Sequence, residues 1–242
     1  MTRRDIKTWA TYLIFLTRPH PYMVSLLFVL ILQAISLISM QVGGQPFVMD
    51  PEAMAAGDVA NAVRFAPENL SWGATSILLA LEVLVVVLRY GFQSFCLHAA
   101  RMEKASYYDM MDGFMVFFRA ILIWLLTGIL VYFGTLALIV PGFILAYTYS
   151  MAPRLLLDHS DWSALRCMRE SRKLMHGRKG DFFRLRLSLL GWTIMSAFPV
   201  TSVFAEPYIH LCETVFYLDA TGDKSLQRAS DASGDEKPPW EY

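Results

Sequence analysis

The sequence predicts an all-α protein: a polytopic bundle of transmembrane helices with about six crossings (four to six) and both termini in the cytoplasm. Three observations lead to this prediction. The chain of 242 residues is 55% hydrophobic and 17% charged, whereas soluble domains carry about 25% charged residues. Its apolar residues form runs long enough to cross a bilayer. Its basic residues gather in segments that alternate with these runs.

The apolar runs define the expected helices, because a membrane-crossing helix needs about 20 mostly apolar residues. One long run, from Ala120 to Leu157, is interrupted by Pro141 and Gly142, and such a pair favours a turn. We therefore expect a helical hairpin there. The expected helices cover residues 22–42, 76–97, 120–140, 143–157, 187–199 and 200–218. The last of these is the most polar, so the count ranges from four to six.

The basic residues orient the bundle, because Lys and Arg accumulate in cytoplasmic loops. If six helices are drawn, nineteen basic residues fall on one side of the membrane and only Arg64 falls on the other. The remaining one, Arg89, lies inside the second helix. The expected organisation is a cytoplasmic interfacial segment, a transmembrane helical domain and a disordered cytoplasmic tail, over residues 1–21, 22–218 and 219–242.

A short helix is expected ahead of the first crossing. Ile6, Trp9, Leu13 and Leu16 follow helical spacing, and prolines at 19 and 21 end the pattern. We expect this helix to lie at the cytoplasmic interface. The first crossing is expected to be retained rather than cleaved, because its apolar run exceeds the 7–15 residues of a signal-peptide core.

Two helices carry polar side chains along one face. In the second helix Glu82, Arg89 and Gln93 share a face, and in the sixth Glu206, His210 and Glu213 are spaced four and three residues apart. Each charge inside a membrane helix costs about 2.5–3.5 kcal/mol near the bilayer centre on insertion scales, so it needs a partner or water. These six residues form the candidate intramembrane polar network.

Three interpretations of this network remain open. The acidic and histidine side chains of the sixth helix could bind a divalent metal, or they could relay protons or ions. The favoured interpretation is structural: Arg89 pairs with a carboxylate on another helix and fixes how the bundle packs. Of the available acids, Glu213 matches Arg89 best in depth.

The second half of the chain contains a recognisable order of residues. Its members are Pro141, Gly142, Ser150, Pro153, Ser171, Arg172, Lys173, Gly177, Gly191, Trp192, Pro207 and Tyr208. From Asp112 to Tyr217 this order resembles the uncharacterised bacterial integral membrane family called domain of unknown function 975. The resemblance implies a multi-pass protein of the cytoplasmic (inner) membrane of a bacterium. It brings no reaction, ligand or cofactor with it.

The segment from Ser171 to Lys179, with the residues just before it, predicts a basic amphipathic helix. Arg166, Arg169 and Arg172 lie opposite Leu165 and Met168 on a helical wheel. Such a helix lies on the anionic cytoplasmic leaflet, where each basic residue contributes about 1 kcal/mol. Membrane lipids are therefore the expected partners, together with a protein partner or a second copy of the chain. The formal net charge of zero argues against nucleic acid.

Sequence patterns of catalysis are missing. The chain has no nucleophile elbow, metalloprotease, Walker or dinucleotide motif, and three scattered cysteines make no zinc or disulfide framework. Asp158, His159, Ser160 and Asp161 include acid and base types, but triad members come from separate elements. We expect Ser160 or Asp161 to cap the next helix.

The expected function is that of a non-catalytic structural or accessory component of the membrane, with no metal and no cofactor. It would act through helix packing and its basic cytoplasmic loop. The alternative is a small permease or an ion or proton channel. Its polar path would be lined by Glu82, Arg89, Glu206, His210 and Glu213.

Overall fold

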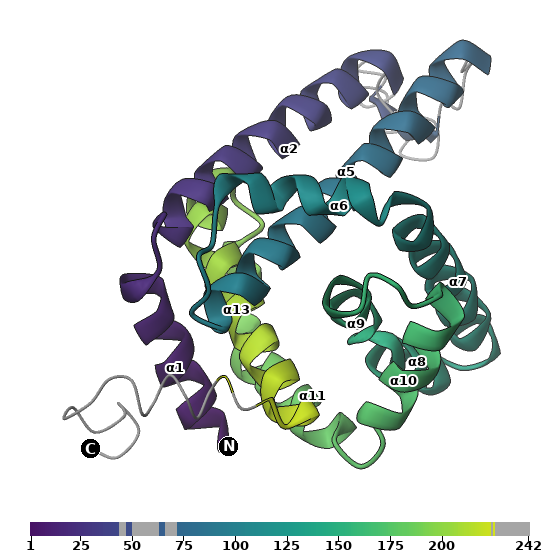
Figure 1. Ribbon diagram of the computed structural model, residues 1–242. Coiled ribbons are helices and arrows are strands. Elements are labelled where there is room, and N and C mark those ends of the chain that lie inside the picture. The colour runs from purple at the N-terminus through teal and green to yellow at the C-terminus, as the bar shows by residue number, and fades with distance from the viewer. Residues whose placement is uncertain (44–46, 50–62, 66–71, 224, 226–242) are drawn as a thin grey trace. The chain divides into compact units, whose positions relative to one another are not determined.

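The computed structural model describes residues 1–43, 47–49, 63–65, 72–223 and 225. The described chain is helical apart from one antiparallel strand pair, β1 (Phe47–Met49) with β2 (Val63–Phe65). The predicted all-α class is therefore confirmed, with the short strand pair as the exception. The helices are α1 (Arg3–Leu16), α2 (Pro21–Gly43), α5 (Trp72–Ala100), η1 (Tyr107–Met111), α6 (Asp112–Met115), α7 (Phe117–Ala137), α8 (Ile139–Tyr149), α9 (Ala152–Asp158), α10 (Ala164–Leu174), α11 (Lys179–Ser188), α12 (Leu190–Met195) and α13 (Pro199–Thr221) (Figure 1).

The chain divides into two compact units. One comprises residues 30–85, with the second part of α2, the strand pair and the first part of α5. The other comprises residues 1–29 together with 86–242. All the groups of the candidate site described below belong to this second, larger unit.

Among the described residues, three helices are long and apolar enough to cross a membrane: α2, α5 and α7. They coincide with the expected crossings at 22–42, 76–97 and 120–140. In α7 only Ala120 and Ile123 are buried. Its exposed large side chains are Phe118, Leu122, Trp124, Leu125, Ile129, Leu130, Tyr132, Phe133 and Leu136. An apolar surface of this extent is typical of contact with lipid or with another protein.

The hairpin between α7 and α8 turns at a different place from the predicted one. Leu138 adopts an extended conformation (φ −164°, ψ 145°) between the two helices, so the chain turns there and not at Pro141 and Gly142. Pro141 lies in the first turn of α8, where a backbone N–H has no intrahelical acceptor and proline costs nothing. Gly142 then faces α7, and a Cβ built on it would lie 2.1 Å from the Thr135 Oγ1 atom.

The fourth and fifth predicted helices are each broken. The run 143–157 divides at Ser150 and Met151 into α8 and α9, and Pro153 lies in the first turn of α9. The predicted helix 187–199 is wrong as a single helix, because α11 ends at Ser188 and α12 ends at Met195. Pro153 explains the first break, since proline is favoured in a first helical turn; no proline lies near the break between α11 and α12.

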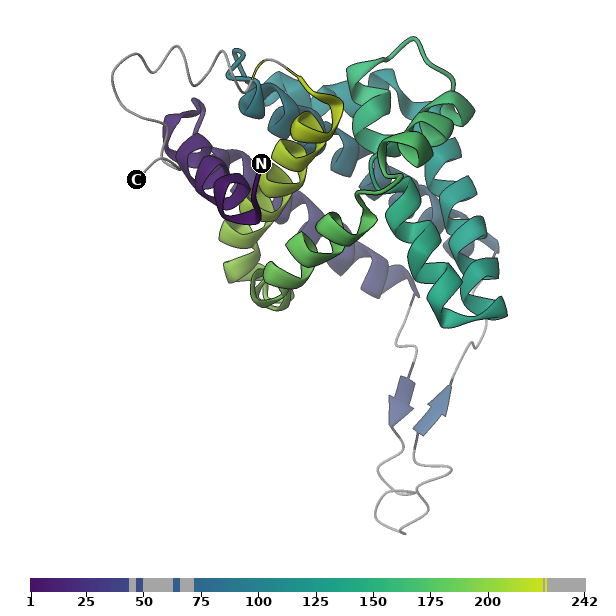
Figure 2. The ribbon, with the colours of Figure 1, turned by 90° about the horizontal axis from the view of Figure 1, so that it is seen from below.

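Helix α13 extends farther than predicted and runs beside α1 (Figure 2). The Met1 amino group lies 3.0 Å from the Asp219 carboxylate, and the rings of Tyr22 and Phe204 lie 5.4 Å apart, so the two segments run antiparallel. The apolar stripe predicted for α1 faces α13, and the Trp9 side chain within it is 1% exposed. Leu16, the last member of that stripe, is exposed.

The basic amphipathic helix is α10, which includes the residues before Ser171 as predicted but ends at Leu174, five residues before the predicted end at Lys179. Its N-cap is Ser163, whose side chain accepts from the Arg166 N–H, so the expected caps at Ser160 and Asp161 are wrong. Its arginines at 166, 169 and 172 are exposed as predicted. Leu165, expected on the apolar face, is exposed. The buried stripe consists of Ala164, Cys167, Met168, Ser171 and Met175.

The tight contact at Gly142 predicts a stability difference between two glycines of the same hairpin. Gly142→Ala should destabilise the protein by about 1–3 kcal/mol, because the new methyl group meets the Thr135 backbone as well as its hydroxyl. Gly128→Ala in α7 is the control, since a Cβ there meets nothing within 4 Å. Thermal unfolding of the purified protein in detergent measures both. Equal melting temperatures for the two variants would contradict the packing described here.

Candidate functional site

A buried carboxylate on α13 is held by two arginines from other helices. Glu213 is 4% exposed, and its Oε2 atom accepts a hydrogen bond of 2.8 Å from Arg154 Nη2 on α9. Its Oε1 atom lies 2.8 Å from Arg186 Nε and 2.6 Å from Nη2 of the same guanidinium on α11. Arg154 is itself 2% exposed and also donates to Thr214 Oγ1 at 3.4 Å. We call these three residues the Glu213 triad.

The Glu213 triad replaces the pair predicted between Arg89 and Glu213, which is wrong. Arg89 is exposed, and among the described residues no carboxylate lies within 4.0 Å of it. The sequence contained a signal for the true partner. Arg154 interrupts the apolar run that ends at Leu157, and a charge inside such a run needs a partner as much as Arg89 does.

The other polar groups of α13 form a separate pair one turn away. His210 Nε2 lies 3.3 Å from Glu206 Oε2, as the spacing of four residues favours. The imidazole also packs edge-on against Phe92 of α5, with ring centres 5.5 Å apart. The predicted face of α13 therefore exists, but its acids are divided between two different sets of partners.

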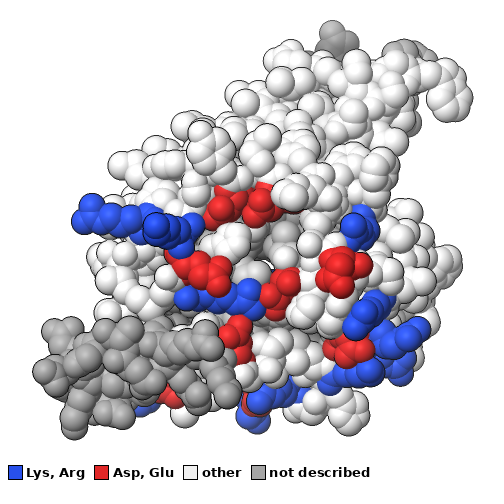
Figure 3. Space-filling model, in the orientation of Figure 1, with Lys and Arg blue, Asp and Glu red and all other residues white. Residues whose placement is uncertain are grey.

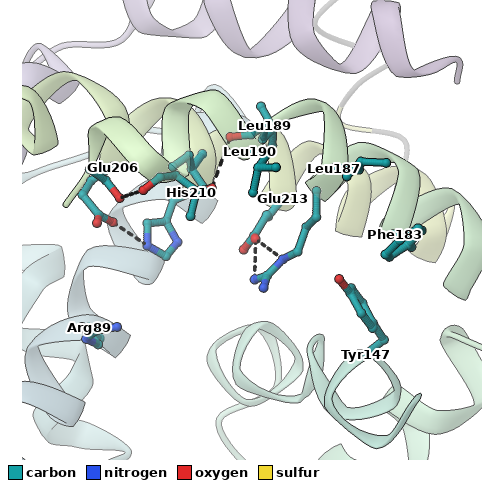
Figure 4. Close-up of a pocket in the computed structure, with 13 residues that line it drawn as sticks. Arg89, Tyr147, Phe183, Leu187, Leu189, Leu190, Glu206, His210 and Glu213 are labelled. Atoms are coloured by element: carbon teal, nitrogen blue, oxygen red, sulfur yellow. Dashed lines mark hydrogen bonds and ion pairs between the residues drawn. The ribbon is translucent and has the colours of Figure 1, made fainter. Parts of the chain in front are cut away.

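Four of the six predicted network residues line one pocket of about 470 Å³ (Figure 4). They are Arg89, Glu206, His210 and Glu213. Polar groups are added by residues 147, 186, 193 and 196, and apolar side chains at 183, 187, 189, 190 and 209 complete the lining. Of the other two predicted residues, Gln93 is half-buried in α5 outside the pocket lining, and Glu82 is exposed in the unit 30–85.

A second ionic network joins the last turn of α13 to α5 and α9. Arg101 lies 2.7 Å from Asp158 and 2.9 Å from Asp223, and the Tyr217 hydroxyl donates to Asp158 at 2.7 Å. Asp219 accepts from the Met1 amino group and from Arg178. Sequence reasoning missed these roles, because it placed Asp158 in a capping loop and Asp219 and Asp223 in the tail. Figure 3 shows acidic and basic side chains interspersed around a hollow.

The electrostatics of this network favour its charged forms. Burial alone would raise the pKa of Asp223, but hydrogen bonds from the Ser225 backbone N–H and from Arg101 outweigh it and hold that pKa below the ordinary value of 3.8. For Arg101, burial lowers the pKa, but hydrogen bonds and attraction to Asp158 and Asp223 raise it by more. The contribution of Asp223 to stability is therefore present at neutral pH and is lost as the pH falls below 3.8.

One group of three metal-ligating side chains converges in the described part of the chain, and it lies outside the predicted network. Ligand atoms of His98, Asp109 and Asp112 lie within 4.8 Å of one another. Each carboxylate has a structural partner: Asp112 accepts from Ser94 at 2.7 Å, and Asp109 accepts from the Ser106 N–H at 2.8 Å. The Ser94 contact joins α5 to α6, the Ser106 contact caps η1, and His98 Nδ1 lies 3.2 Å from Asp109, so the group has a packing role.

The residues that carried the family resemblance have structural roles. The ring of Trp192 lies 4.9 Å from that of Tyr208, which joins two motif positions distant in sequence. Ser171 donates to the Thr148 carbonyl oxygen at 2.8 Å. Gly177 has a φ of +81°, a conformation that glycine adopts without strain, in the turn between α10 and α11.

The burial of the Glu213 triad predicts a large effect of a small change. Glu213→Gln should destabilise the protein by about 3–5 kcal/mol, because two guanidinium groups lose the carboxylate between them. Adding Arg154→Gln should cost less than the sum of the single changes, since the charge that lacked compensation is removed as well. Thermal unfolding in detergent measures all the variants.

Glu170→Gln is the matched control for this experiment. Glu170 pairs with Lys173 at 2.7 Å on the exposed side of α10, and such surface pairs contribute about 0–1 kcal/mol. Equal destabilisation by Glu213→Gln and Glu170→Gln would show that the triad does not hold these helices together.

Comparison with known proteins finds one family model that matches part of the chain. No curated protein and no solved structure matches the chain. Residues 129–224, from within α7 to just beyond the end of α13, match the model of the family described as "Protein of unknown function (DUF975)", which confirms the resemblance predicted for the second half of the sequence.

Proposed function

We propose that this protein is a multi-pass component of a bacterial cytoplasmic membrane, with a non-catalytic structural or accessory role. The observation that carries the proposal is the Glu213 triad. Both carboxylate oxygens of Glu213 are occupied by arginines from α9 and α11, so this acid fixes three segments of the chain together. A carboxylate that carried ions or protons would have to release these partners in each cycle.

The proposed topology has six crossings and both termini in the cytoplasm. The contact of Met1 with Asp219 supports placing both termini on the same side of the membrane, because it brings the start of α1 and the end of α13 together. Arg178, from the basic segment between α10 and α11, binds the same carboxylate. Nineteen of the basic residues then lie in the cytoplasm, in accord with the general bias of membrane proteins.

Cysteine labelling tests this topology. With six crossings, Ala56→Cys and Ala197→Cys should react with a membrane-impermeant maleimide from outside, and Ser230→Cys should react only after permeabilisation. Ala197 is exposed in the turn before α13, so it distinguishes six crossings from four. Reaction of Ala197→Cys only from the cytoplasmic side would refute the six-crossing topology.

The native cysteines provide a low background for this labelling. Cys96, Cys167 and Cys212 are all buried. Burial raises the pKa of the Cys167 thiol to about 11, so at pH 7 this cysteine is protonated and unreactive. The wild-type protein should therefore remain unlabelled on both sides of the membrane.

The second candidate function is a small permease or a channel for ions or protons. The pocket favours it, because Arg89, Glu206 and His210 line the same space. A path of this kind would use the pair of Glu206 and His210, because carboxylate and imidazole side chains are common parts of proton relays. The proposed structural role would then be secondary.

Proteoliposomes containing the full chain distinguish the two functions. The accessory role predicts that an imposed pH or salt gradient decays at the rate of empty liposomes. It also predicts that the protein purified from its native membrane carries a stoichiometric protein partner. That partner should be lost when Arg166, Arg169 and Arg172 are changed together to Gln. Gradient decay that depends on the protein and is abolished by Glu206→Gln would favour the permease.

A further inference from the structure

We propose that the pocket beside the Glu213 triad is a binding site for an anionic membrane lipid. The phosphate of the headgroup would be held between Arg89 and Arg186, with the acyl chains outside along α11 and α12. The inference depends on the membrane location proposed above but not on the accessory role. Cysteine labelling and flux measurements test the proposed topology and function, whereas lipid binding is measured separately, so failure of one proposal is distinguishable from failure of the other.

The charges around the pocket favour the binding of an anion over that of a cation. Arg89, Arg154 and Arg186 face Glu206 and Glu213 across the pocket and its wall, which leaves one positive charge when His210 is neutral. Arg89 is the cation without a close ion pair: within the described chain no acidic side chain lies within 4.0 Å of it, and its charge acts on Glu206 only at longer range. An exposed arginine without a partner at the edge of a pocket is a natural ligand for phosphate.

Arg186 can contribute to the same site without leaving Glu213. It contacts the Glu213 carboxylate through Nε and Nη2. Its Nη1 group therefore has no acceptor among the described residues, and the side chain as a whole is 50% exposed. The carboxylate thus holds one edge of the guanidinium in place while the other edge remains available to an anion.

A cation is a poor match for the same pocket. Glu206 is paired with His210 at 3.3 Å, and both oxygens of Glu213 are occupied by arginines. A metal ion would have to displace these partners and enter a site with excess positive charge. An anion needs no such rearrangement.

The lining of the pocket indicates an amphipathic ligand rather than a free anion. Three exposed apolar side chains, Phe183, Leu187 and Leu190, border the polar groups along α11 and the start of α12. Their exposed fractions are 48%, 57% and 50%. Figure 4 shows the labelled apolar residues of α11 and the start of α12 beside the Glu213 carboxylate. Acyl chains can cover this surface while the headgroup reaches Arg89.

The size of the pocket limits what enters it. At about 470 Å³ it is at the lower end of the range of small-molecule sites, which suits a headgroup but not the chains of a whole phospholipid. The lipid would therefore bind from the side, with its headgroup inside and its tails in the bilayer.

Binding of defined lipids to the purified full-length protein tests this inference. We expect dioleoyl phosphatidylglycerol, titrated in neutral detergent and followed by native mass spectrometry, to bind about tenfold more tightly than dioleoyl phosphatidylcholine. Arg89→Gln should remove most of this preference. It should not change the melting temperature, because Arg89 has no ion pair to lose in the described structure.

Arg184→Gln is the matched control. Arg184 is an exposed arginine on the same helix as Arg186 but does not line the pocket, so its loss should leave the lipid preference unchanged. Equal losses for Arg89→Gln and Arg184→Gln would show general surface attraction and overturn the site. Inorganic phosphate that displaced the lipid at equal concentration would show a site for the free anion and would overturn the lipid assignment.

Discussion

The arrangement of the helices around α13 depends on one constraint: the carboxylate of Glu213 is buried and must be compensated. Removing an ion from water costs several kcal/mol, and only partners with good geometry repay it. Arg154 and Arg186 supply these partners from two short helices that hydropathy alone would not place beside α13. The position of α9 and α11, and therefore the pocket between α5, α11 and α13, follows from satisfying this one charge.

Polarity in this protein is distributed in the opposite way from that of a soluble domain. α7 exposes most of its large apolar side chains, whereas α13, with three acidic residues, is buried along its second half. In a bilayer the apolar exterior costs nothing, and small residues and polar contacts hold the helices together instead. The Gly142 contact with Thr135 and the ionic networks at both ends of α9 are examples.

The residues of the second half that carried the family resemblance make turns between helices or contacts between them. Pro153 lies in the first turn of α9, Gly177 makes the turn before α11, and the ring of Trp192 on α12 packs against that of Tyr208 on α13. None of these roles requires a substrate. The groups that could bind a ligand are Arg89 and the outer edge of Arg186. A lipid held there would contact helices whose positions are already fixed by these structural contacts.

The sequence by itself determined the class, the three most apolar helices, the basic face of α10 and the shared face of Glu206 and His210, because each depends on composition or on spacing within one segment. Only the tertiary structure decided which arginines bind Glu213, because Arg154, Arg186 and Arg89 are equivalent cations until the folded chain brings two of them to it. The same holds for Asp158, Asp219 and Asp223, whose partners are 41 to 218 residues away. Local periodicity carries no information about contacts at that separation.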